Sequence, residues 1–282
     1  MQESTIFYIY ASDLALRDLR AAADALLRKY GRLDGLTADE EGYRRGSKES
    51  VFFRAKSNVF SIYLIGEKGN YSSIGISVGS EQIDPKVKSY TPKACLRTVA
   101  RFTGWLKTIA LTLGNRAQWG IGDSAEAIDA YFFPFSKEKY LESHLPRFWL
   151  NYYGHALTAK IGRKTLLETP AYATEAVGDG VLIQTLPLPS LYLPRSYNAH
   201  QKMLASESED WKKLMEYGDT EETHLKKIEE YFLRNWRVAT LEEDGKKTDE
   251  YLERQYGWSV KPPRNKGGTG RSWLAKFLEK IK

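Results

Sequence analysis

The segment SVFFRAKSNVFSIYLIGEKGNYSSIGISVGS, residues 50–80, predicts β structure. In its second part Ile74, Ile76 and Val78 alternate with glycine and serine, the period of two expected of a strand with one buried face. Its first part is apolar at nearly every position from 59 to 65, so we expect burial on both faces there. The residues between them, 67–70, read Glu-Lys-Gly-Asn, a composition typical of a hairpin. The segment therefore predicts two strands joined by a tight turn.

A β-α unit is predicted before this segment. Residues 6–10 form a short apolar run, and Ser12 is expected to cap the following helix by accepting a hydrogen bond from its first turn. Gly31 is expected to end that helix, because glycine readily adopts the left-handed backbone found after helix C-termini. The apolar positions of the helix have helical spacing and are Leu16, Leu19, Ala23, Leu26 and Tyr30.

A long helix is predicted after the segment. Thr91-Pro92 indicates its start, since proline at the first helical position loses no hydrogen bond that the helix needs. Gly114 is expected to end it. The buried stripe of this helix is predicted to be Phe102, Leu106, Ile109 and Leu113.

The middle of the chain loosely repeats this order of elements. Its second α/β stretch comprises residues 130–135, RFWLNYYGHALTAKIG at 147–162 and GVLIQTLPLP at 180–189. The aromatic density of residues 147–162 is compatible with an active site or with a packed core. We favour the core, with Trp149 and Tyr152 pointing inward, their polar atoms hydrogen-bonded, and with Gly154 and Gly162 at turns.

The last part of the chain is predicted to be helical and charged from about residue 197. Asp219 or Thr220 is expected to cap a helix whose buried face holds Leu225, Ile228, Phe232 and Trp236. Residues 260–272, VKPPRNKGGTGRS, read as a linker before a short amphipathic tail. The fold class is therefore α+β: mixed or antiparallel sheets packed with long helices, two loosely similar α/β halves and a helical C-terminal extension. The predicted divisions are 1–205, 206–260 and 261–282.

The net charge of +6 belongs to the end of the chain. Residues 261–282 hold seven basic residues and one acidic residue, so the totals of 42 basic and 36 acidic residues leave residues 1–260 with equal numbers of each. Nucleic-acid binding by the body of the protein is therefore not supported by its net charge. The single cysteine excludes an internal disulfide framework and is typical of a reducing compartment. With no long apolar run and no secretion-type leader, we expect a cytoplasmic protein that does not enter a membrane.

Motifs that could carry chemistry are weak. Ser77 lies in a G-x-S-x-G match at 75–79, but the alternation runs straight through it, which indicates a serine within a strand and not a nucleophile elbow. Cys95 lies in the first helical turn near a lysine, where a thiol can become reactive, although we favour a small buried residue. The histidines at 144, 155, 200 and 224 lack the spacing of a metal site. We thus expect no catalytic, cofactor-binding or metal-binding residues, and no enzyme activity.

The order of aromatic, glycine and apolar segments in the second half resembles the immunity protein 52 family. The matching features are WLNYYG at 149–154, a short helix ending at Gly162, the strand at 181–186 and a tyrosine-containing closing helix at 197–204. The resemblance extends loosely over residues 5–205 and implies an α+β binding protein without catalytic residues. Such proteins protect bacteria from polymorphic or type VI secretion toxins, often nucleases. Residues 206–282 exceed what the family needs, and a homodimer contact or part of a toxin-binding face are open alternatives for them.

The leading hypothesis is therefore an intracellular immunity protein that neutralises a cognate toxin, possibly a nuclease, by direct protein–protein inhibition. A local acidic patch from the SESED motif at 206–210 to residue 222 is the candidate for mimicry of nucleic acid. The alternative is a nucleic-acid-associated protein whose basic tail contacts phosphates and stacks a tryptophan on bases. The candidate partner-binding positions are Ser208, Asp210, Trp211, Glu221 and Glu222 in the patch, and Arg264, Lys266, Arg271 and Trp273 in the tail.

Overall fold

The computed structural model describes residues 4–30, 36–45, 48–55, 60–67, 70–79, 83–85, 91–132, 145–196 and 208–236. All the described residues belong to one compact unit within residues 1–239. The predicted boundaries at 205 and 260 stay predictions, because the residues around them lie outside these ranges. Among the described helices, none is long and apolar enough to cross a membrane.

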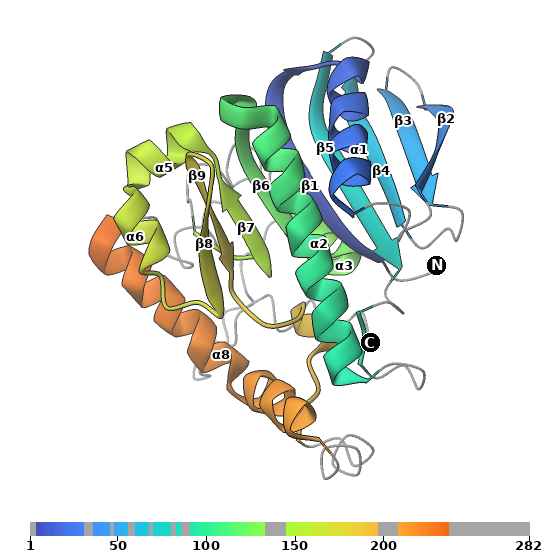
Figure 1. Ribbon diagram of the computed structural model, residues 1–282. Coiled ribbons are helices and arrows are strands. Elements are labelled where there is room, and N and C mark those ends of the chain that lie inside the picture. Colours follow the sequence, from blue (N-terminus) through green and yellow to red (C-terminus); the bar gives the residue numbers. More distant parts are fainter. Residues whose placement is uncertain are drawn as a thin grey trace, which may run out of the picture. The chain divides into compact units, whose positions relative to one another are not determined.

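A nine-stranded sheet in the order β2-β3-β4-β5-β1-β6-β7-β9-β8 forms the centre of this unit (Figure 1). Every neighbouring pair is antiparallel, which confirms the α+β class. Strands β1 to β5 come from residues 4–79 and strands β6 to β9 from residues 117–184, and the two groups join through the β1–β6 pair. The strands are β1 Ser4–Leu14, β2 Leu36–Arg45, β3 Lys48–Ala55, β4 Phe60–Glu67, β5 Asn70–Gly79, β6 Ala117–Ser124, β7 Leu150–Tyr153, β8 Ala173–Val177 and β9 Gly180–Gln184.

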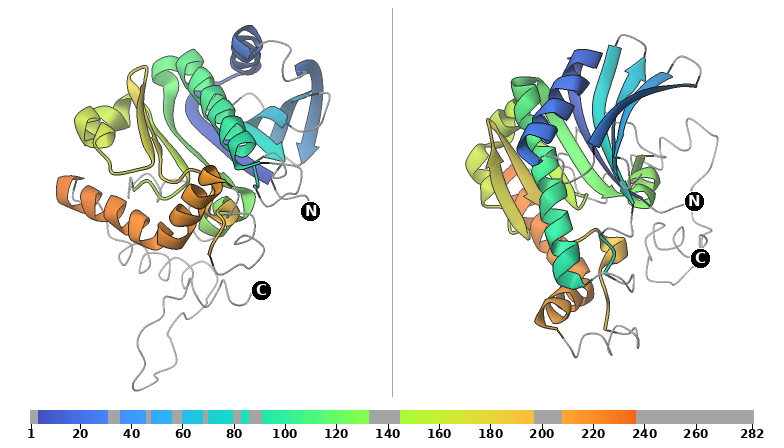
Figure 2. Two further views of the ribbon diagram at one scale, coloured as in Figure 1. Left: turned by 60° about the horizontal axis from the view of Figure 1, so that its bottom comes forward. Right: turned by 45° about the vertical axis from the view of Figure 1, so that its right-hand side comes forward.

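Helices cover both faces of the sheet (Figure 2). Helices α1 and α2 bury their apolar stripes against one face, where Phe7, Ile9 and Ile76 belong to the same core. On the other face, α3 packs near Trp119, and α5, α6 and the end of α8 pack near Val181. The helical segments are α1 Leu16–Tyr30, α2 Pro92–Leu113, α3 Ala125–Phe132, α5 His155–Ile161, α6 Arg163–Leu167 and α8 Glu209–Trp236, with short 3₁₀ turns η3 Gly114–Arg116 and η4 Ser190–Tyr192.

Helix α8 joins the cores of the two faces. In its first half Leu214 belongs to the core shared with α2, whereas Ile228 and Phe232 in its second half belong to the core with α5 and α6. The expected helix cap at Asp219 or Thr220 is therefore wrong, since both residues lie in the middle of this one helix. Asp219 instead accepts a hydrogen bond from the Ser196 backbone at 2.8 Å.

The predicted ends of the other long helices have different outcomes. For α2 the prediction is confirmed: the Thr91 hydroxyl accepts from the Ala94 N–H at 3.2 Å, and Gly114 has φ +57°. For α1 the expected cap is wrong, because β1 continues through position 12 as far as Leu14. The first turn is held by Asp18, whose carboxylate accepts the Ala15 N–H at 2.8 Å.

The predicted hairpin is confirmed by the pairing of Glu67 with Asn70 between β4 and β5. Strand β6 went unpredicted, because its apolar residues are interrupted by Gly120 and Gly122. These glycines face α2, and a β-carbon at position 122 would lie 2.3 Å from the Phe7 ring. Glycine therefore makes room for the large side chains of β1 at the centre of the sheet.

Residues 148–151 are part of the scaffold, as predicted. Trp149 is 1% exposed, and its indole N–H donates to the Leu186 carbonyl at 2.8 Å. Its backbone N–H donates to the buried Asp123 carboxylate at 2.8 Å. The Asn151 side chain both accepts from and donates to the Phe148 backbone. These bonds satisfy buried polar groups and fix the segment before β7 between β6 and residues 184–187.

Candidate functional site

A depression of the described surface lies where three chain turns meet. The first is the β8–β9 hairpin, in which Val177 pairs with Gly180 across the two residues Gly178 and Asp179. Gly178 has φ +57°, as required at the first central position of a type II′ turn. This turn places the Asp179 side chain at an exposed position beside the end of α2.

The second turn is the C-terminus of α2. The Gly114 N–H donates to the Ala110 carbonyl and closes the helix. The last carbonyl groups of a helix lack intrahelical partners and give this end a partial negative charge. Leu111, in the last helical turn, is 54% exposed and is the most exposed of the large hydrophobic side chains described.

The third turn joins β7 to α5 at Gly154. A β-carbon there would lie 1.9 Å from the Ala117 carbonyl oxygen, so only glycine permits the close approach to β6. The turn sets the buried Tyr152 and the exposed His155 on the same side of the depression. The predictions that Gly154 and Gly162 mark turns between elements are confirmed.

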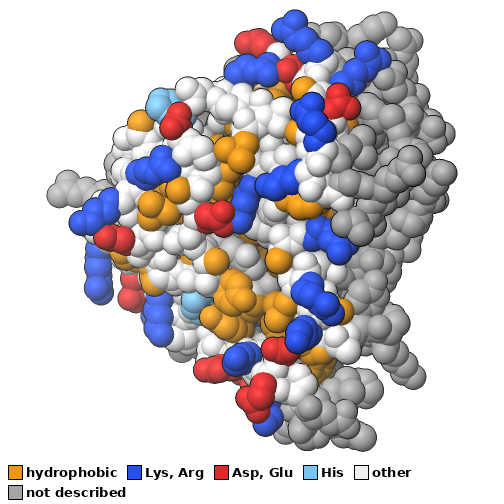
Figure 3. Space-filling model, viewed as in Figure 1, with side chains coloured by type: hydrophobic (Ala, Val, Ile, Leu, Met, Phe, Trp, Pro, Cys, Tyr) orange, Lys and Arg blue, Asp and Glu red, His pale blue; other side chains and the backbone are white. Residues whose placement is uncertain are grey.

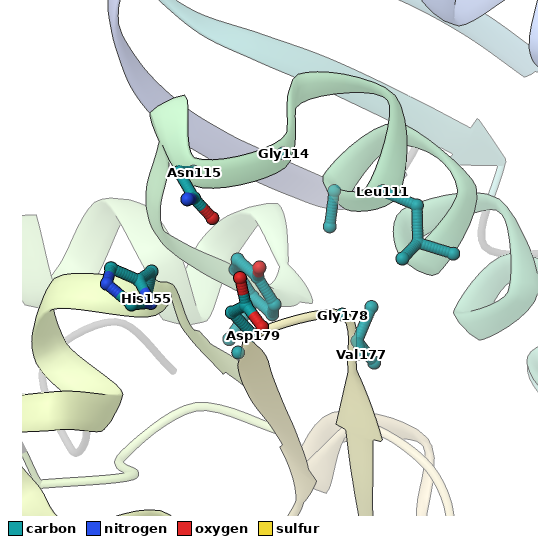
Figure 4. Close-up of a pocket in the computed structure, with 10 residues that line it drawn as sticks. Leu111, Gly114, Asn115, His155, Val177, Gly178 and Asp179 are labelled. Atoms are coloured by element: carbon teal, nitrogen blue, oxygen red, sulfur yellow. The ribbon is translucent and has the colours of Figure 1, made fainter.

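Together these turns enclose a pocket of about 150 Å³ (Figure 4). Its exposed rim comprises Leu111, Asn115, His155 and Asp179, and the labelled polar side chains among them converge on one opening. Its buried floor comprises Ala110, Tyr152, Val177 and Gly180.

Tyr152 is the unusual member of this floor. Its side chain is only 5% exposed, yet its hydroxyl makes no hydrogen bond with any residue that the structure describes. Burial, followed by the nearby Asp179 carboxylate, raises the pKa of Tyr152 to about 12, so the phenol stays protonated. The hydroxyl oxygen lies 2.6 Å from where a β-carbon of Gly180 would be, which shows that the glycine leaves space for it. The prediction that Tyr152 points into the core is confirmed for its ring, but not for a hydrogen-bonded hydroxyl.

The size of the pocket limits what it can hold. Sites for small-molecule ligands and cofactors usually enclose about 300–1,000 Å³. A cavity of about 150 Å³ accommodates a group the size of benzene. The pocket therefore matches the head group of one side chain, not a substrate or a nucleotide.

The structure places three side chains that the sequence offered as candidate reactive groups, and none of them has the surroundings of a reactive group. Ser77 lies within β5, paired with both Ile6 and Ser61, so it is not on a nucleophile elbow. Burial, followed by the Asp84 carboxylate, raises the pKa of Cys95 to about 12, which disfavours a reactive thiolate. His224 is hydrogen-bonded to the Thr185 carbonyl at 2.8 Å. Within the described residues, no group of three or more potential ligands could hold a metal ion.

The candidate positions of the acidic patch lie on α8 or beside its start, away from this pocket. Trp211 is 2% exposed, and Glu221 pairs with Arg195 at 2.7 Å, which leaves its side chain 12% exposed. Ser208 and Asp210 are half-buried, and Glu222 is exposed. The tail positions Arg264, Lys266, Arg271 and Trp273, the linker at 260–272, and the closing helix expected at 197–204 lie outside the described residues.

The pocket residues themselves did not emerge from sequence reasoning. The available signals were Gly114 at the end of the long helix and the V-G-D-G turn at 177–180, but neither indicates that the two meet. A comparison with protein-family models, curated proteins and solved structures gives no match for this chain. The resemblance to the immunity protein 52 family therefore stays a prediction.

Proposed function

We propose that this protein binds and neutralises a bacterial toxin by direct contact, as the resemblance to immunity proteins suggests. A nuclease is the toxin class that the resemblance favours. The observation that carries the proposal is a pocket of side-chain size with the exposed Leu111 at its rim. Such a pocket beside an exposed apolar residue is typical of a protein-binding surface, where a few anchor residues supply most of the binding energy.

The surroundings of the pocket support contact with a protein. Strand β8 lies at the edge of the sheet, with Leu111 near its last residue and Tyr172, 41% exposed, just before its first. The Tyr172 ring contacts Tyr217 of α8 edge to face, with centroids 5.5 Å apart. Figure 3 shows hydrophobic side chains gathered on this face, among basic and acidic groups. We name Leu111, Tyr172, Tyr217 and the pocket the α2–β8 surface.

One ion pair crosses the α2–β8 surface. Lys107 of α2 is bound to Glu175 of β8, and the Lys107 side chain is 23% exposed. The pair fastens the long helix to the edge strand between the two apolar ends of the surface.

Co-expression with the product of the adjacent gene tests the proposal. We expect that product to stop growth, and this protein to restore growth and to co-elute with it in size-exclusion chromatography. Leu111→Lys should weaken the complex, because a charge replaces an apolar contact. Ala100→Lys adds the same charge at an exposed position of the same helix and should leave binding unchanged. An adjacent product that is harmless, or toxicity that this protein fails to relieve, would overturn the proposal.

A further inference from the structure

We propose that the pocket of the α2–β8 surface receives the guanidinium group of an arginine side chain from the bound partner. This inference rests on the proposed function for the identity of the partner, but the chemistry of the pocket carries the choice of side chain. Three features point to it: an unpaired carboxylate, the end of a helix and the hydroxyl of a largely buried tyrosine that makes no hydrogen bond with the described residues.

The electrostatics of the pocket favour a cation. Asp179 is exposed at the rim and forms no ion pair within the described residues. The C-terminal end of α2, at Gly114, adds a partial negative charge. Two cations lie beside these residues: Arg116 pairs with Asp18 at 2.5 Å, whereas Arg163 donates to the neutral Gly178 carbonyl at 3.0 Å and keeps its charge. His155 is the remaining titratable group at the rim.

The Tyr152 hydroxyl is the second and independent indication of a ligand. The Tyr152 side chain is 5% exposed, and its hydroxyl keeps some accessible surface at the pocket and makes no hydrogen bond with the described residues. An incoming N–H donor could donate a hydrogen bond to the hydroxyl oxygen. It would also lie close to Asp179, whose negative charge is near enough to raise the pKa of the Tyr152 phenol.

Other occupants fit these groups less well. A carboxylate would be repelled by Asp179 and by the end of α2. A purely apolar side chain would remove both Asp179 and the Tyr152 hydroxyl from water without replacing their hydrogen bonds. A metal ion would find one carboxylate, and no group of three ligands occurs in the described residues.

Arginine is favoured over lysine by the shape of the pocket. The hydrogen-bond acceptors are the side chains of Asn115, Tyr152 and Asp179. They come from three separate parts of the chain: η3, β7 and the β8–β9 turn. A guanidinium group presents five N–H donors in one plane and can reach several acceptors at once, whereas an ammonium group is a compact, strongly hydrated charge. In the floor of the pocket, the apolar side chains of Ala110 and Val177 suit the methylene part of an arginine side chain.

The first test uses a small probe in place of the partner. ¹⁵N-labelled protein is titrated with Nα-acetyl-arginine amide, and the amide signals of residues 114–115 and 178–180 are followed by NMR. We expect saturable shifts confined to these residues, and binding weaker by about tenfold in Asp179→Asn, because the variant removes the charge that attracts the ligand. Tyr152→Phe should also weaken binding. The exposed Asp24→Asn, the same loss of one negative charge at a position on α1, should change nothing.

Several results would overturn the inference. Nα-acetyl-lysine amide producing equal shifts would contradict the choice of arginine, and unsaturable shifts would show that the pocket binds neither. An affinity that is unchanged in Asp179→Asn would place the ligand elsewhere. Co-expression separates this inference from the proposed function: neutralisation unaffected by Asp179→Asn overturns the arginine site alone. Arginine binding without neutralisation of any adjacent-gene product overturns the function while the site stands.

Discussion

Gly218, in the middle of α8, lies directly against the backbone of Pro194. A β-carbon at position 218 would be 1.9 Å from the Pro194 carbonyl oxygen, closer than atoms can approach. Next to this contact, Arg195 donates to the Gly218 carbonyl and to the Glu221 carboxylate, both at 2.7 Å. A glycine inside a helix costs about 1 kcal/mol relative to alanine, and here it permits a connecting segment to lie against the helix.

We predict that Gly218→Ala lowers the free energy of unfolding by about 1–3 kcal/mol, as expected when a methyl group is forced into a packed contact. At an ordinary helical position the same change would stabilise the protein by about 1 kcal/mol, so the sign of the effect is diagnostic. Urea denaturation measures it. Thr223→Ala, at an exposed position of the same helix, should stay within about 0.5 kcal/mol of the parent. A gain of stability in Gly218→Ala would show that the contact with Pro194 is absent.

The contact at Gly218 also explains why the sequence wrongly predicted the start of a helix at Asp219 or Thr220. Asp219 and Thr220 have the residue types of a helix cap, and a glycine directly before them strengthens that reading. Only the packing of residues 194–196 against α8 explains the glycine within a continuous helix. By contrast, Thr91-Pro92 and Gly114 were sufficient to place α2, because the signals at both of its ends are local.

The candidate site shows the same division between local and tertiary information. The V-G-D-G turn and the end of α2 are each visible in the sequence, but Asn115, Tyr152 and Asp179 come together only through the order of strands in the sheet. In the sequence, Tyr152 has the pattern of a core residue, and its ring does lie in the core. The missing hydrogen-bond partner of its hydroxyl is a property of the folded arrangement, so no sequence pattern could indicate it.

The buried Asp123 carboxylate predicts how stability depends on pH. Burial raises its pKa to about 6, and the nearby Glu221 adds to this, although the N–H groups of Trp149 and Ser124 act in the opposite direction. In the unfolded chain the ordinary pKa is 3.8. Between these values the folded protein keeps a proton that the unfolded chain has released, so this group's contribution to stability falls as the pH rises.

We therefore predict that the stability difference between the parent protein and Asp123→Asn shifts against the parent from pH 4 to pH 7, by up to about 3 kcal/mol. The variant also loses one acceptor for a backbone N–H, which lowers its stability by an amount that we expect to be the same at each pH. Denaturation at several pH values measures the difference. Glu222→Gln, an exposed change of the same kind, should show no such trend, and a pH-independent difference for Asp123→Asn would contradict the raised pKa.

Tyr152→Phe separates a role in binding from a role in folding. The hydroxyl it removes belongs to a side chain that is 5% exposed and makes no hydrogen bond with the described residues, so its loss should leave the free energy of unfolding unchanged or raise it by up to about 1 kcal/mol. Trp149→Phe is the contrasting variant, because its indole N–H does donate to the Leu186 carbonyl at 2.8 Å, and the smaller ring leaves a cavity. That variant should lose about 2–4 kcal/mol of its free energy of unfolding.

If Tyr152→Phe were destabilised to the same degree, the hydroxyl would have an internal partner and would not be available to a ligand. Stability that is kept, together with weaker binding of the arginine probe, is the combination expected of a hydroxyl that serves a bound guanidinium group.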